Sequence, residues 1–394
     1  MDSSSYLPYG KHQILEDDIA SVVEVLKHGQ LTQGEIVPNF EQMICQSVGA
    51  AYSVATNSAT SALHLACLSL GISKGDCVWT SPITFVASAN CARYCGADVD
   101  FVDIEYETGL ISIDALRLKI QDALKTNNLP KALIVVHLAG RSCDMEQIYS
   151  IVSPHNIQII EDASHALGSS YQDEQVGSCK YSDATVFSFH PVKMITTAEG
   201  GILTTNSLSV FESASLLRSH GITKDPTRFK NDCSGLWHYE QQALGFNYRL
   251  SDMQAALGLS QLSRLPEIVR ERNRLYQAYS QRLVKSPYYL VESAADGNIS
   301  SLHLAIVQLP EICAIQHERL FAKMREMKIG VQLHYSPVHL QPYYKDLGFS
   351  ERDFPSALKY ARTSLSIPLF VGLTEKQQDR VVRCLHQAYE EIDI

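Results

Sequence analysis

The segment FSFHPVKMITTAEGG, residues 187–201, places one lysine, Lys193, just beyond an apolar run that is typical of a buried strand. Threonines and two glycines flank this lysine, in place of the charged residues that accompany a lysine on a solvated surface. A lysine that forms a Schiff base needs a lowered ammonium pKa, and a desolvated setting lowers it. Lys193 is therefore a candidate for carbonyl chemistry. The alternative is an ordinary ion pair at a strand exit.

A second candidate is Asp162, which lies at the end of the apolar run in IQIIEDASHALGS, residues 157–169. Open α/β sheets bind their ligands beyond the carboxyl ends of the strands, where this aspartate is expected to lie. A cofactor that uses a pyridine ring as an electron sink needs a carboxylate to keep the ring nitrogen protonated. Asp162 could fill that role, or it could simply cap the helix that follows.

The third segment is TNSATSALHLACLSLG, residues 56–71, in which Asn57, Ser58 and Thr60 begin an expected amphipathic helix after a strand. Free backbone N–H groups and the helix dipole make such a helix start a site for phosphate. Plain helix capping is the alternative. The three segments together are far more specific than any one of them.

Short apolar runs alternate with helical patterns between about residues 52 and 206. This alternation predicts a doubly wound α/β domain, whose elements must position these residues. The runs IQII and LIVV are apolar on both faces and should form central strands. We expect an N-terminal arm (1–40) that packs on the small domain, a large domain (41–285) and a smaller α+β domain (286–394). The expected strands of the large domain are YSVAT, DCVWT, VDFV, KALIVV, NIQIIED, ATVFSF and GILTT.

Composition restricts the function further. The 394 residues are 45% hydrophobic and 19% charged, which is the balance of a globular protein. A net charge of -10 argues against nucleic-acid binding, and no segment approaches the ~20 apolar residues of a membrane span. We expect a cytoplasmic protein whose ten scattered cysteines are reduced, with no metal site.

The ordered set NSATSAL, SPITFVASAN, EDASHALGS, FSFHPVKMITTAEGG and GFNYRLSDMQAALGL resembles the DegT/StrS family of nucleotide-sugar aminotransferases over nearly the whole chain. The resemblance implies fold type I of the pyridoxal-phosphate (PLP) enzymes, with a large mixed-sheet domain and a smaller α+β domain. Within the family, the chain is most similar to the aminotransferases of pseudaminic acid biosynthesis, through the segments LTQG, SHALGS, FSFHPVK and LHYSP. One departure is Met194, because the family often has proline there.

Carried over to this sequence, the resemblance makes Lys193 the residue that holds PLP as a Schiff base and moves protons. Asp162 would pair with the pyridinium nitrogen. Phe85 would stack on the ring, with Ser164 or His165 near its opposite side. The phosphate would be held by Ser58, Ala59, Thr60 and Ser188, helped by Asn247 from the partner subunit of a homodimer.

The resemblance also implies the substrates: an amino group would pass from L-glutamate to carbon 4 of a UDP-linked 4-keto-6-deoxy-N-acetylhexosamine. The product would be UDP-4-amino-4,6-dideoxy-N-acetyl-beta-L-altrosamine. Contacts with the nucleotide sugar would fall on Tyr9, Gly29, Gln30, Leu31, Thr32, Leu333, His334, Tyr335 and Ser336.

Other functions remain open at this point. The enzyme could act on another nucleotide keto sugar, of the bacillosamine type or linked to dTDP. A related sugar dehydratase would carry histidine at the position of Lys193, and a non-catalytic protein of the same fold would be expected to lose Lys193 or Asp162. A dinucleotide-binding oxidoreductase would need G-x-G-x-x-G after the first strand, and that motif is missing.

Overall fold

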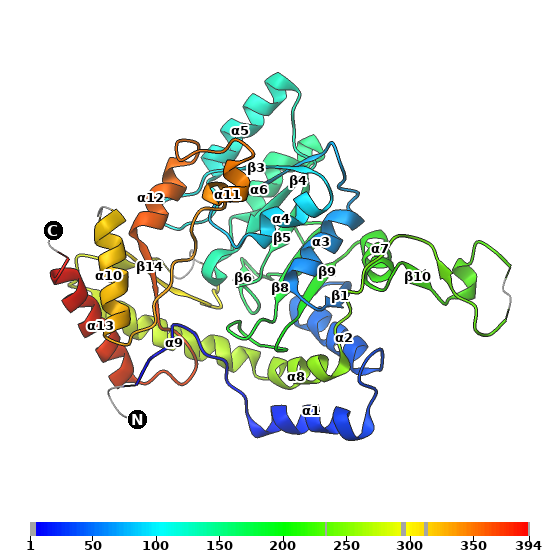
Figure 1. Ribbon diagram of the computed structural model, residues 1–394, viewed down its shortest axis with the longest axis horizontal. Coiled ribbons are helices and arrows are strands. Elements are labelled where there is room, and N and C mark those ends of the chain that lie inside the picture. Colours follow the sequence, from blue (N-terminus) through cyan, green and yellow to red (C-terminus); the bar gives the residue numbers. More distant parts are fainter. Residues whose placement is uncertain (1–4, 233–234, 293–296, 311–313, 393–394) are drawn as a thin grey trace.

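The computed structural model describes residues 5–232, 235–292, 297–310 and 314–392. Its centre is a seven-stranded sheet in the order β1-β9-β8-β5-β4-β2-β3 (Figure 1). Strand β9 is antiparallel to both of its neighbours, and the other adjacent pairs are parallel. All seven predicted strands are present, and the predicted mixed α/β fold is confirmed. The strands are β1 (Tyr52–Thr56), β2 (Cys77–Thr80), β3 (Asp98–Phe101), β4 (Ala132–Val136), β5 (Gln158–Asp162), β8 (Ala184–Ser188) and β9 (Gly201–Thr205).

Helices cover both faces of this sheet, because side chains that alternate along each strand enter different clusters. Ile134 and Ile160 pack with α3 and α4, whereas Leu133 and Ile159 pack with α5 and α6. The helices of this domain include α3 (Ala59–Ser69), α4 (Ala87–Tyr94), α5 (Ile113–Thr126), α6 (Met145–Val152) and α7 (Leu208–Arg218).

Helix α3 differs from its prediction as an amphipathic helix, because seven consecutive residues from Ser61 to Cys67 are buried. The sheet covers one side of this helix, and α4 and α7 cover others. A helix that is enclosed in this way needs small or apolar residues all round. Ala62, Leu63, Leu65 and Ala66 supply them.

The N-terminal segment contacts both domains, although we expected it to pack on the small domain. Leu7 forms an isolated bridge with Ile329 in the small domain. Helix α1 (Glu16–His28) instead lies on α8 (Asp252–Leu262), and the buried Asp18 pairs with Arg264 at 2.7 Å. Helix α2 (Ile36–Val48) also joins the large domain, since its Phe40 and Ile44 are fully buried there.

The smaller domain is α+β, with a three-stranded antiparallel sheet in the order β12-β13-β14. The segment GVQLHYSP (330–337) enters no strand, and within it only Gln332 forms a bridge, with Ser366. The described chain begins beside this domain, where Arg380 donates to the backbone carbonyl of Ser5 at 2.9 Å. Its elements are β12 (Tyr289–Leu290), β13 (Ala305–Gln308), β14 (Ser364–Ile367), α10 (Ala314–Glu326), α11 (Pro342–Lys345), α12 (Pro355–Thr363) and α13 (Glu375–Glu390).

Helix α9 (Leu265–Leu283) connects the two domains. Leu265 packs in the large-domain core, whereas Leu275 and Tyr279 pack in the core of the small domain. Between them Arg272, which is 4% exposed, donates to three backbone carbonyls. The acceptors are the carbonyl oxygens of Leu302, His303 and Leu369.

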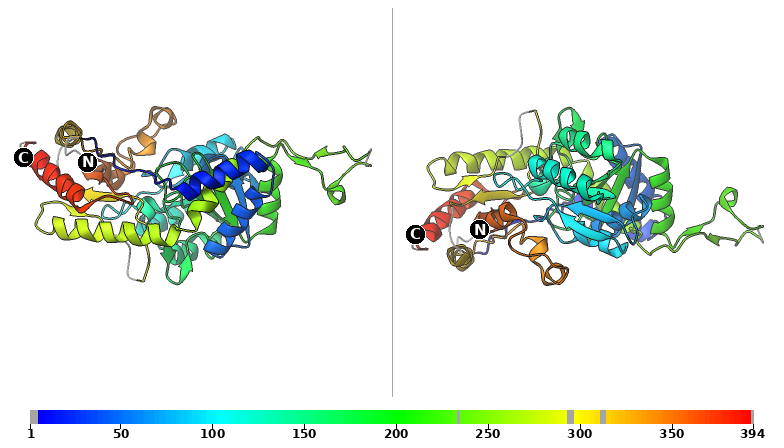
Figure 2. Two further views of the ribbon diagram at one scale, coloured as in Figure 1. Left: turned by 90° about the horizontal axis from the view of Figure 1, so that it is seen from below. Right: turned by 90° about the horizontal axis from the view of Figure 1, so that it is seen from above.

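The polar segment after α7 forms an arm that projects from the body of the molecule (Figures 1 and 2). Strands β10 (Ile222–Thr223) and β11 (Glu240–Gln241) pair within it. Large apolar side chains on the arm are exposed to solvent, among them Leu236 and Trp237. A second short hairpin joins β6 (Ser170–Tyr171) to β7 (Glu174–Gln175).

The cysteines of the described segments, eight in number, are free thiols, whereas Cys233 and Cys313 lie outside those segments. In the described part of the chain, no helix has both the length and the apolar character needed to cross a bilayer. These described residues also contain no cluster of three or more histidine, cysteine, aspartate or glutamate side chains arranged to hold a metal ion.

Candidate active site

A cavity of about 740 Å³ opens at the carboxyl end of the central sheet, between the large domain and a wall built by the small domain. Lys193 and Asp162 both line it, so the two residues that sequence analysis singled out for chemistry share one chamber. From the other predicted positions, the cavity also includes Tyr9, Ser58, Ala59, Thr60, Phe85, Ser164, His165, Ser188, Leu333, His334, Tyr335 and Ser336.

Asp162 is the last residue of β5, and its side chain is 5% exposed. Oδ1 accepts from the backbone N–H of Ser164 at 3.1 Å and from its hydroxyl at 2.6 Å. Oδ2 accepts from the hydroxyl of Ser88 at 2.5 Å. A carboxylate has about four lone-pair sites, so one site is left for a donor in the cavity.

The start of α3 forms another part of the wall. Ser58 is the N-cap, and its hydroxyl accepts from the N–H of Ser61 at 3.2 Å. In the sequence, such capping was the alternative to phosphate binding. The cap still leaves the first helical residues, Ala59 and Thr60, with N–H groups that have no partner inside the helix. Gly201 packs tightly behind this turn, because a Cβ atom there would lie 2.5 Å from the carbonyl carbon of Ser58.

Lys193 lies in the turn that follows β8, where its backbone N–H donates to the carbonyl of His190 at 2.9 Å. Burial lowers the pKa of the Lys193 ammonium to about 8, although the negative charge of Asp162 acts in the opposite direction. Desolvation disfavours the charged form of a lysine, so a larger fraction of this amine is uncharged near neutral pH than in a solvated lysine. The side chain thus has the property that Schiff-base and proton-transfer chemistry needs.

Tyr335 and His334 of the small domain face His165, which follows β5 in the large domain. Nδ1 of His165 accepts the N–H of Ala139 at 3.2 Å, and burial holds the pKa of this imidazole well below its usual value. The neutral ring therefore carries its proton on Nε2, which lies 3.1 Å from the hydroxyl of Tyr335. Tyr335 accepts this hydrogen bond and keeps its own proton for another acceptor. His334 is held by Ser366, with 2.8 Å between Nδ1 and the serine hydroxyl oxygen.

Five of the predicted site residues do not line this cavity. Asn247 forms an isolated bridge with Ser219 at the base of the arm. Gly29, Gln30, Leu31 and Thr32 lie in the connection from α1 to α2, at the opposite side of α8 from the small domain (Figure 1). These five residues therefore lie outside the cavity lining of this chain, although the carbonyl of Asn247 accepts from Nδ2 of Asn57, the neighbour of Ser58, at 3.5 Å.

Sequence analysis also missed residues that belong to the site. Ser88 holds Asp162, and His303 lines the cavity with its ring centroid 4.4 Å from that of His165. The signal for Ser88 was available in SPITFVASAN: Thr84 and Ser88 are four residues apart, and their hydroxyl oxygens lie 2.6 Å from each other. His303 carried no such signal, because it comes from a distant strand region in the small domain.

This set of groups fits the chemistry of PLP. The free N–H groups at the start of α3 suit a phosphate, and the buried Asp162 with an unused lone pair suits a pyridinium N–H. Lys193 supplies an amine with a lowered pKa. The cavity therefore holds the three kinds of group that the cofactor requires.

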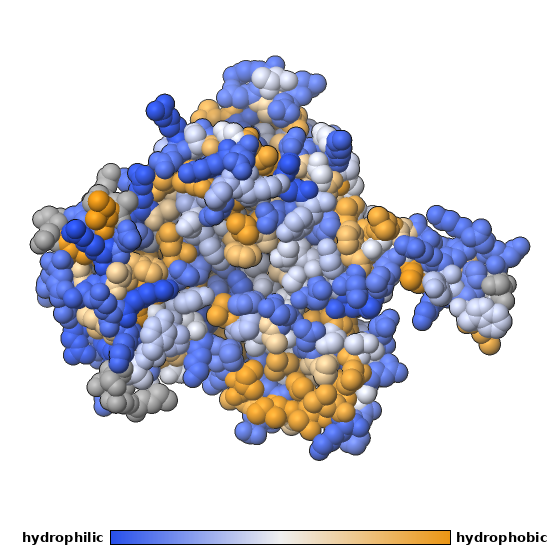
Figure 3. Space-filling view, viewed as in Figure 1, coloured by the Kyte–Doolittle hydropathy of each residue, from blue (hydrophilic) through white to orange (hydrophobic). Residues whose placement is uncertain are grey.

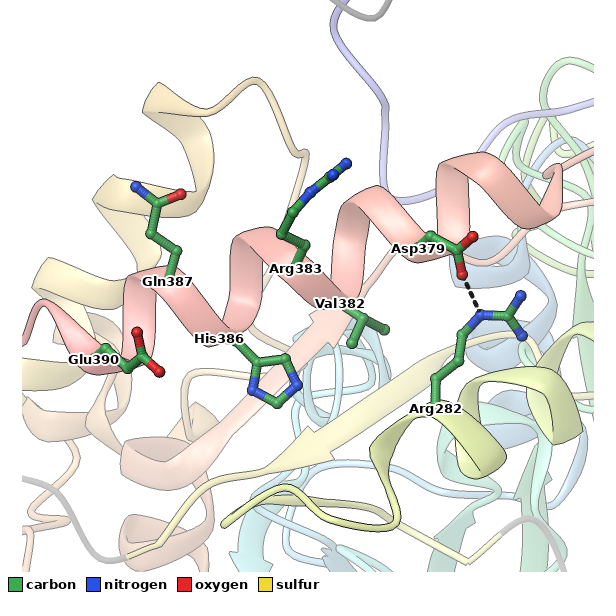
Figure 4. Close-up of a pocket in the computed structure, with 7 residues that line it drawn as sticks. All are labelled: Arg282, Asp379, Val382, Arg383, His386, Gln387 and Glu390. Atoms are coloured by element: carbon green, nitrogen blue, oxygen red, sulfur yellow. Dashed lines mark hydrogen bonds and ion pairs between the residues drawn. The ribbon is translucent and has the colours of Figure 1, made fainter.

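A second hollow lies on the surface of the small domain, between α9 and α13 (Figure 4). Arg282 and Asp379 form an ion pair across it at 2.7 Å. His386 is engaged too, with its Nδ1 2.9 Å from the hydroxyl of Tyr288. None of the residues that line this hollow lines the cavity around Lys193, so it is separate from the candidate site.

Comparison with known proteins gives a consistent result over nearly the full length. The model of the DegT/DnrJ/EryC1/StrS aminotransferase family matches residues 12–386. The chain is 35% identical over 391 residues to the spore coat polysaccharide biosynthesis protein SpsC of Bacillus subtilis, covering 98% of each chain. It is 37% identical over 387 residues, again 98% of each chain, to a UDP-4-amino-4,6-dideoxy-N-acetyl-beta-L-altrosamine transaminase of Campylobacter jejuni.

Solved structures are also similar. The putative sugar aminotransferase Spr1654 from Streptococcus pneumoniae, in its PMP form, superposes with a TM-score of 0.91 at 28% identity, covering 98% of this chain and 100% of that one. Helicobacter pylori PseC, an aminotransferase involved in the biosynthesis of pseudoaminic acid, superposes with a TM-score of 0.89 at 30% identity and the same coverage.

Proposed function

The chain belongs to the DegT/DnrJ/EryC1/StrS aminotransferase family, and from this premise we propose that it aminates carbon 4 of a UDP-linked 4-keto-6-deoxy-N-acetylhexosamine, with L-glutamate as donor. The family and the similar proteins show that the chain is a sugar aminotransferase. The PMP and PLP forms of its structural neighbour imply that it uses PLP. The observation that carries the proposal is the shared cavity of Lys193 and Asp162.

In this proposal Lys193 holds PLP through a Schiff base, Asp162 accepts from the ring nitrogen, and the start of α3 with Ser188 holds the phosphate. When bound, the cofactor supplies an electron sink that stabilises negative charge at the carbon that loses a proton. Nζ of Lys193, released as a free amine, takes and returns a proton at the α-carbon of the donor. Phe85 would stack on the ring, with Ser164 or His165 near its opposite side.

The proposed nucleotide-sugar site is the wall that carries Tyr9 and the stretch Leu333–Ser336. Burial raises the pKa of the Tyr335 phenol far above the working range, so this side chain stays a hydrogen-bond donor. A donor of this kind suits a sugar rich in hydroxyl and carbonyl oxygens. Binding energy from the remote nucleotide then positions the keto carbon for reaction.

Support for the sugar comes from the similar proteins, since one is named a transaminase of UDP-4-amino-4,6-dideoxy-N-acetyl-beta-L-altrosamine. The second candidate is another nucleotide keto sugar, because the spore coat protein SpsC is almost as similar. The presence of Lys193 argues against the sugar dehydratases, which carry histidine at this position.

We also propose a homodimer with shared active sites, in which Asn247 and the residues from Gly29 to Thr32 reach the cavity of the partner. The support is that these residues lie outside the cavity of their own chain. Apolar side chains also gather on the exposed face of α1, where Ile19 and Leu26 are 48% and 55% exposed (Figure 3). A patch of this kind on a folded protein marks an interaction surface.

Two experiments test these proposals. Borohydride reduction of the enzyme with PLP, followed by peptide mass spectrometry, should place the cofactor on the peptide with Lys193, and Lys193→Ala should lose both label and turnover while it stays folded. A label on another lysine would refute this assignment. For the sugar, kcat/KM should favour the L-arabino 4-keto epimer, and a clear preference for the D-xylo epimer would redirect the substrate proposal to bacillosamine-type products.

A further inference from the structure

Helices α3 and α4 pack side by side in the large domain (Figure 1), and three cysteine thiols meet between them. Cys67 lies on α3, Cys91 lies on α4, and Cys95 caps the end of α4. Cys67 and Cys91 are fully buried, whereas Cys95 is partly exposed. The sulfur of Cys67 takes part in hydrogen bonds with both of the others. These three residues form a thiol cluster, and none of them lines the cavity around Lys193.

His64, one turn before Cys67 on α3, adds an imidazole to the thiol cluster. The ring is buried, and its Nδ1 lies 3.2 Å from the hydroxyl oxygen of Tyr248. It also forms a hydrogen bond with the sulfur of Cys95. A thiol beside an imidazole that a third group orients is the arrangement of an activated cysteine nucleophile.

The hydrogen bonds around Cys95 favour its thiolate form. The bond from Cys67 contributes most and His64 adds to it, so that the pKa of the Cys95 thiol is lowered to about 6, although burial acts in the opposite direction. Hydrogen bonds with Cys91 and Cys95, together with burial, raise the pKa of the Cys67 thiol well above its ordinary value. Cys67 therefore keeps its proton and donates it to the thiolate of Cys95.

Tyr248 orients the imidazole from its other side. Burial, together with the charges of Tyr94 and Cys95, raises the pKa of the Tyr248 phenol. A phenol that keeps its proton can donate to Nδ1 of His64, and the proton of the neutral ring then lies on Nε2. That N–H is a donor for the thiolate of Cys95.

The other partly exposed cysteines of the described segments lack such surroundings. They are Cys45 on α2, Cys77 on β2 and Cys384 on α13. Burial raises the pKa of the thiol in all three, to about 11 in Cys77. Within the described part of the chain, Cys95 is therefore the partly exposed thiol that is most ready to react.

We propose that Cys95 is a site of reversible oxidation by hydrogen peroxide, with Cys67 as the resolving thiol. The sulfur of Cys95 attacks one oxygen of the peroxide, the O–O bond breaks, and Cys95 is oxidised to a sulfenic acid. The other oxygen leaves as hydroxide and takes up a proton to become water. The sulfur of Cys67 then attacks the sulfur of Cys95 and forms an S–S bond. The hydroxyl group of the sulfenic acid leaves as water with the proton of Cys67.

A bridge between Cys67 and Cys95 would join α3 to α4 at the ends that lie away from the cavity, since it is the starts of both helices that line it. A dithiol reductant would restore both thiols by exchange. Because the thiol cluster lies outside the cavity, this inference stands or falls independently of the proposed function.

The first test measures the pH dependence of alkylation. The reduced, full-length protein would be pulsed with iodoacetamide over a range of pH values, with mass spectrometry of the Cys95 and Cys45 peptides. Cys95 should be half-maximally reactive near pH 6, whereas Cys45, the internal control, should need a pH above the ordinary thiol value of ~8.5. The midpoint is a better readout than one rate, because a thiolate loses nucleophilicity as its pKa falls.

Two variants of Cys67 separate its hydrogen bond from its thiol. Cys67→Ser keeps a donor for Cys95, so the midpoint should stay within about half a pH unit of the wild type. Cys67→Ala removes the donor and should raise the midpoint by about one pH unit or more. The two substitutions are similar in size, so a general loosening of the fold would move both midpoints alike.

The second test follows the oxidation itself. After treatment with hydrogen peroxide, peptide mapping without reductant should show a disulfide between Cys67 and Cys95 that dithiothreitol removes. In Cys67→Ser no bridge can form, so the sulfenic acid on Cys95 should capture at least about threefold more dimedone than in the wild type.

The inference is wrong if Cys95 and Cys45 show the same alkylation midpoint, or if peroxide yields no bridge between Cys67 and Cys95. A bridge from Cys67 to Cys91 in its place would also overturn it, because Cys95 would then not be the thiol that peroxide oxidises. Equal midpoints in Cys67→Ser and Cys67→Ala would remove the hydrogen bond from Cys67 as the cause of the reactivity.

Discussion

The hydroxyl of Ser88 donates to Oδ2 of Asp162 across 2.5 Å, so the carboxylate is fixed from the α4 side as well as by Ser164 on its own loop. Hydrogen bonds to a charged group contribute about 1.5–3 kcal/mol each. We predict that Ser88→Ala lowers kcat about tenfold or more, because the carboxylate gains freedom to rotate. Steady-state kinetics measures this effect, with the exposed Ser73→Ala as control, and an unchanged kcat would remove Ser88 from the site.

Asp162→Asn should disable catalysis more severely than Ser88→Ala. A neutral amide has the same shape but cannot hold a pyridine nitrogen in its protonated form. We expect less than a tenth of wild-type activity, which corresponds to a loss of more than ~1.4 kcal/mol of transition-state stabilisation. Single-turnover kinetics with L-glutamate would show the defect directly. Retention of more than a tenth of the activity would mean that Asp162 has another role.

Shared active sites predict complementation between two inactive variants. Lys193→Ala lacks the reacting amine, and Asn247→Asp places a negative charge where the partner's phosphate is proposed to bind. A hybrid dimer has one site with both defects and one with neither. Equal mixing should therefore restore about a quarter of the wild-type activity. If mass spectrometry verifies subunit exchange and no activity returns, Asn247 does not act across the interface.

His334 should make the protein sensitive to acid. Burial lowers the pKa of its imidazole to about 3, whereas in the unfolded chain the value is close to 6.5. Between these values the unfolded state binds a proton that the native state does not, so stability falls as the pH decreases below 6.5. From pH 6.5 to 5 this amounts to at most ~2 kcal/mol.

Urea unfolding at pH 7 and pH 5 would measure this contribution. His334→Gln keeps a polar group beside Ser366 and removes the titration, so its stability should decrease less on acidification than that of the wild type. The exposed His190→Gln serves as the control. Equal losses in the wild type and in His334→Gln would show that His334 is protonated in the native state at pH 5.

The sequence predicted those features whose residues lie close together along the chain. The strands and the surroundings of Lys193 and Asp162 were predictable, because strand, turn and functional residue follow one another within about fifteen positions. The contact between Gln261 and the turn after Lys193 was not, because 65 residues separate Gln261 from Thr196. The packing of α1 on α8 depends likewise on Asp18 and Arg264, which only the tertiary fold brings together.

The burial of α3 was missed for a different reason. The prediction of an amphipathic helix did not include the burial of its polar residues Ser61 and His64. Both side chains are buried, and they make hydrogen bonds inside the protein, Ser61 with Asn57 and His64 with Tyr248. The burial of a polar side chain can be predicted only when its hydrogen-bond partner is known. These partners belong to other elements or to the turn before the helix.

Arg272 has a consequence for the way the molecule unfolds. Its three carbonyl acceptors all belong to segments of the smaller domain or its entry, whereas the helix that carries it begins inside the core of the larger one. If the smaller domain melted first, a guanidinium would lose all of these acceptors at once, and α9 would lose the packing of its second half. Local opening of that kind is costly, so the two cores should resist heat together and melt as a single cooperative unit.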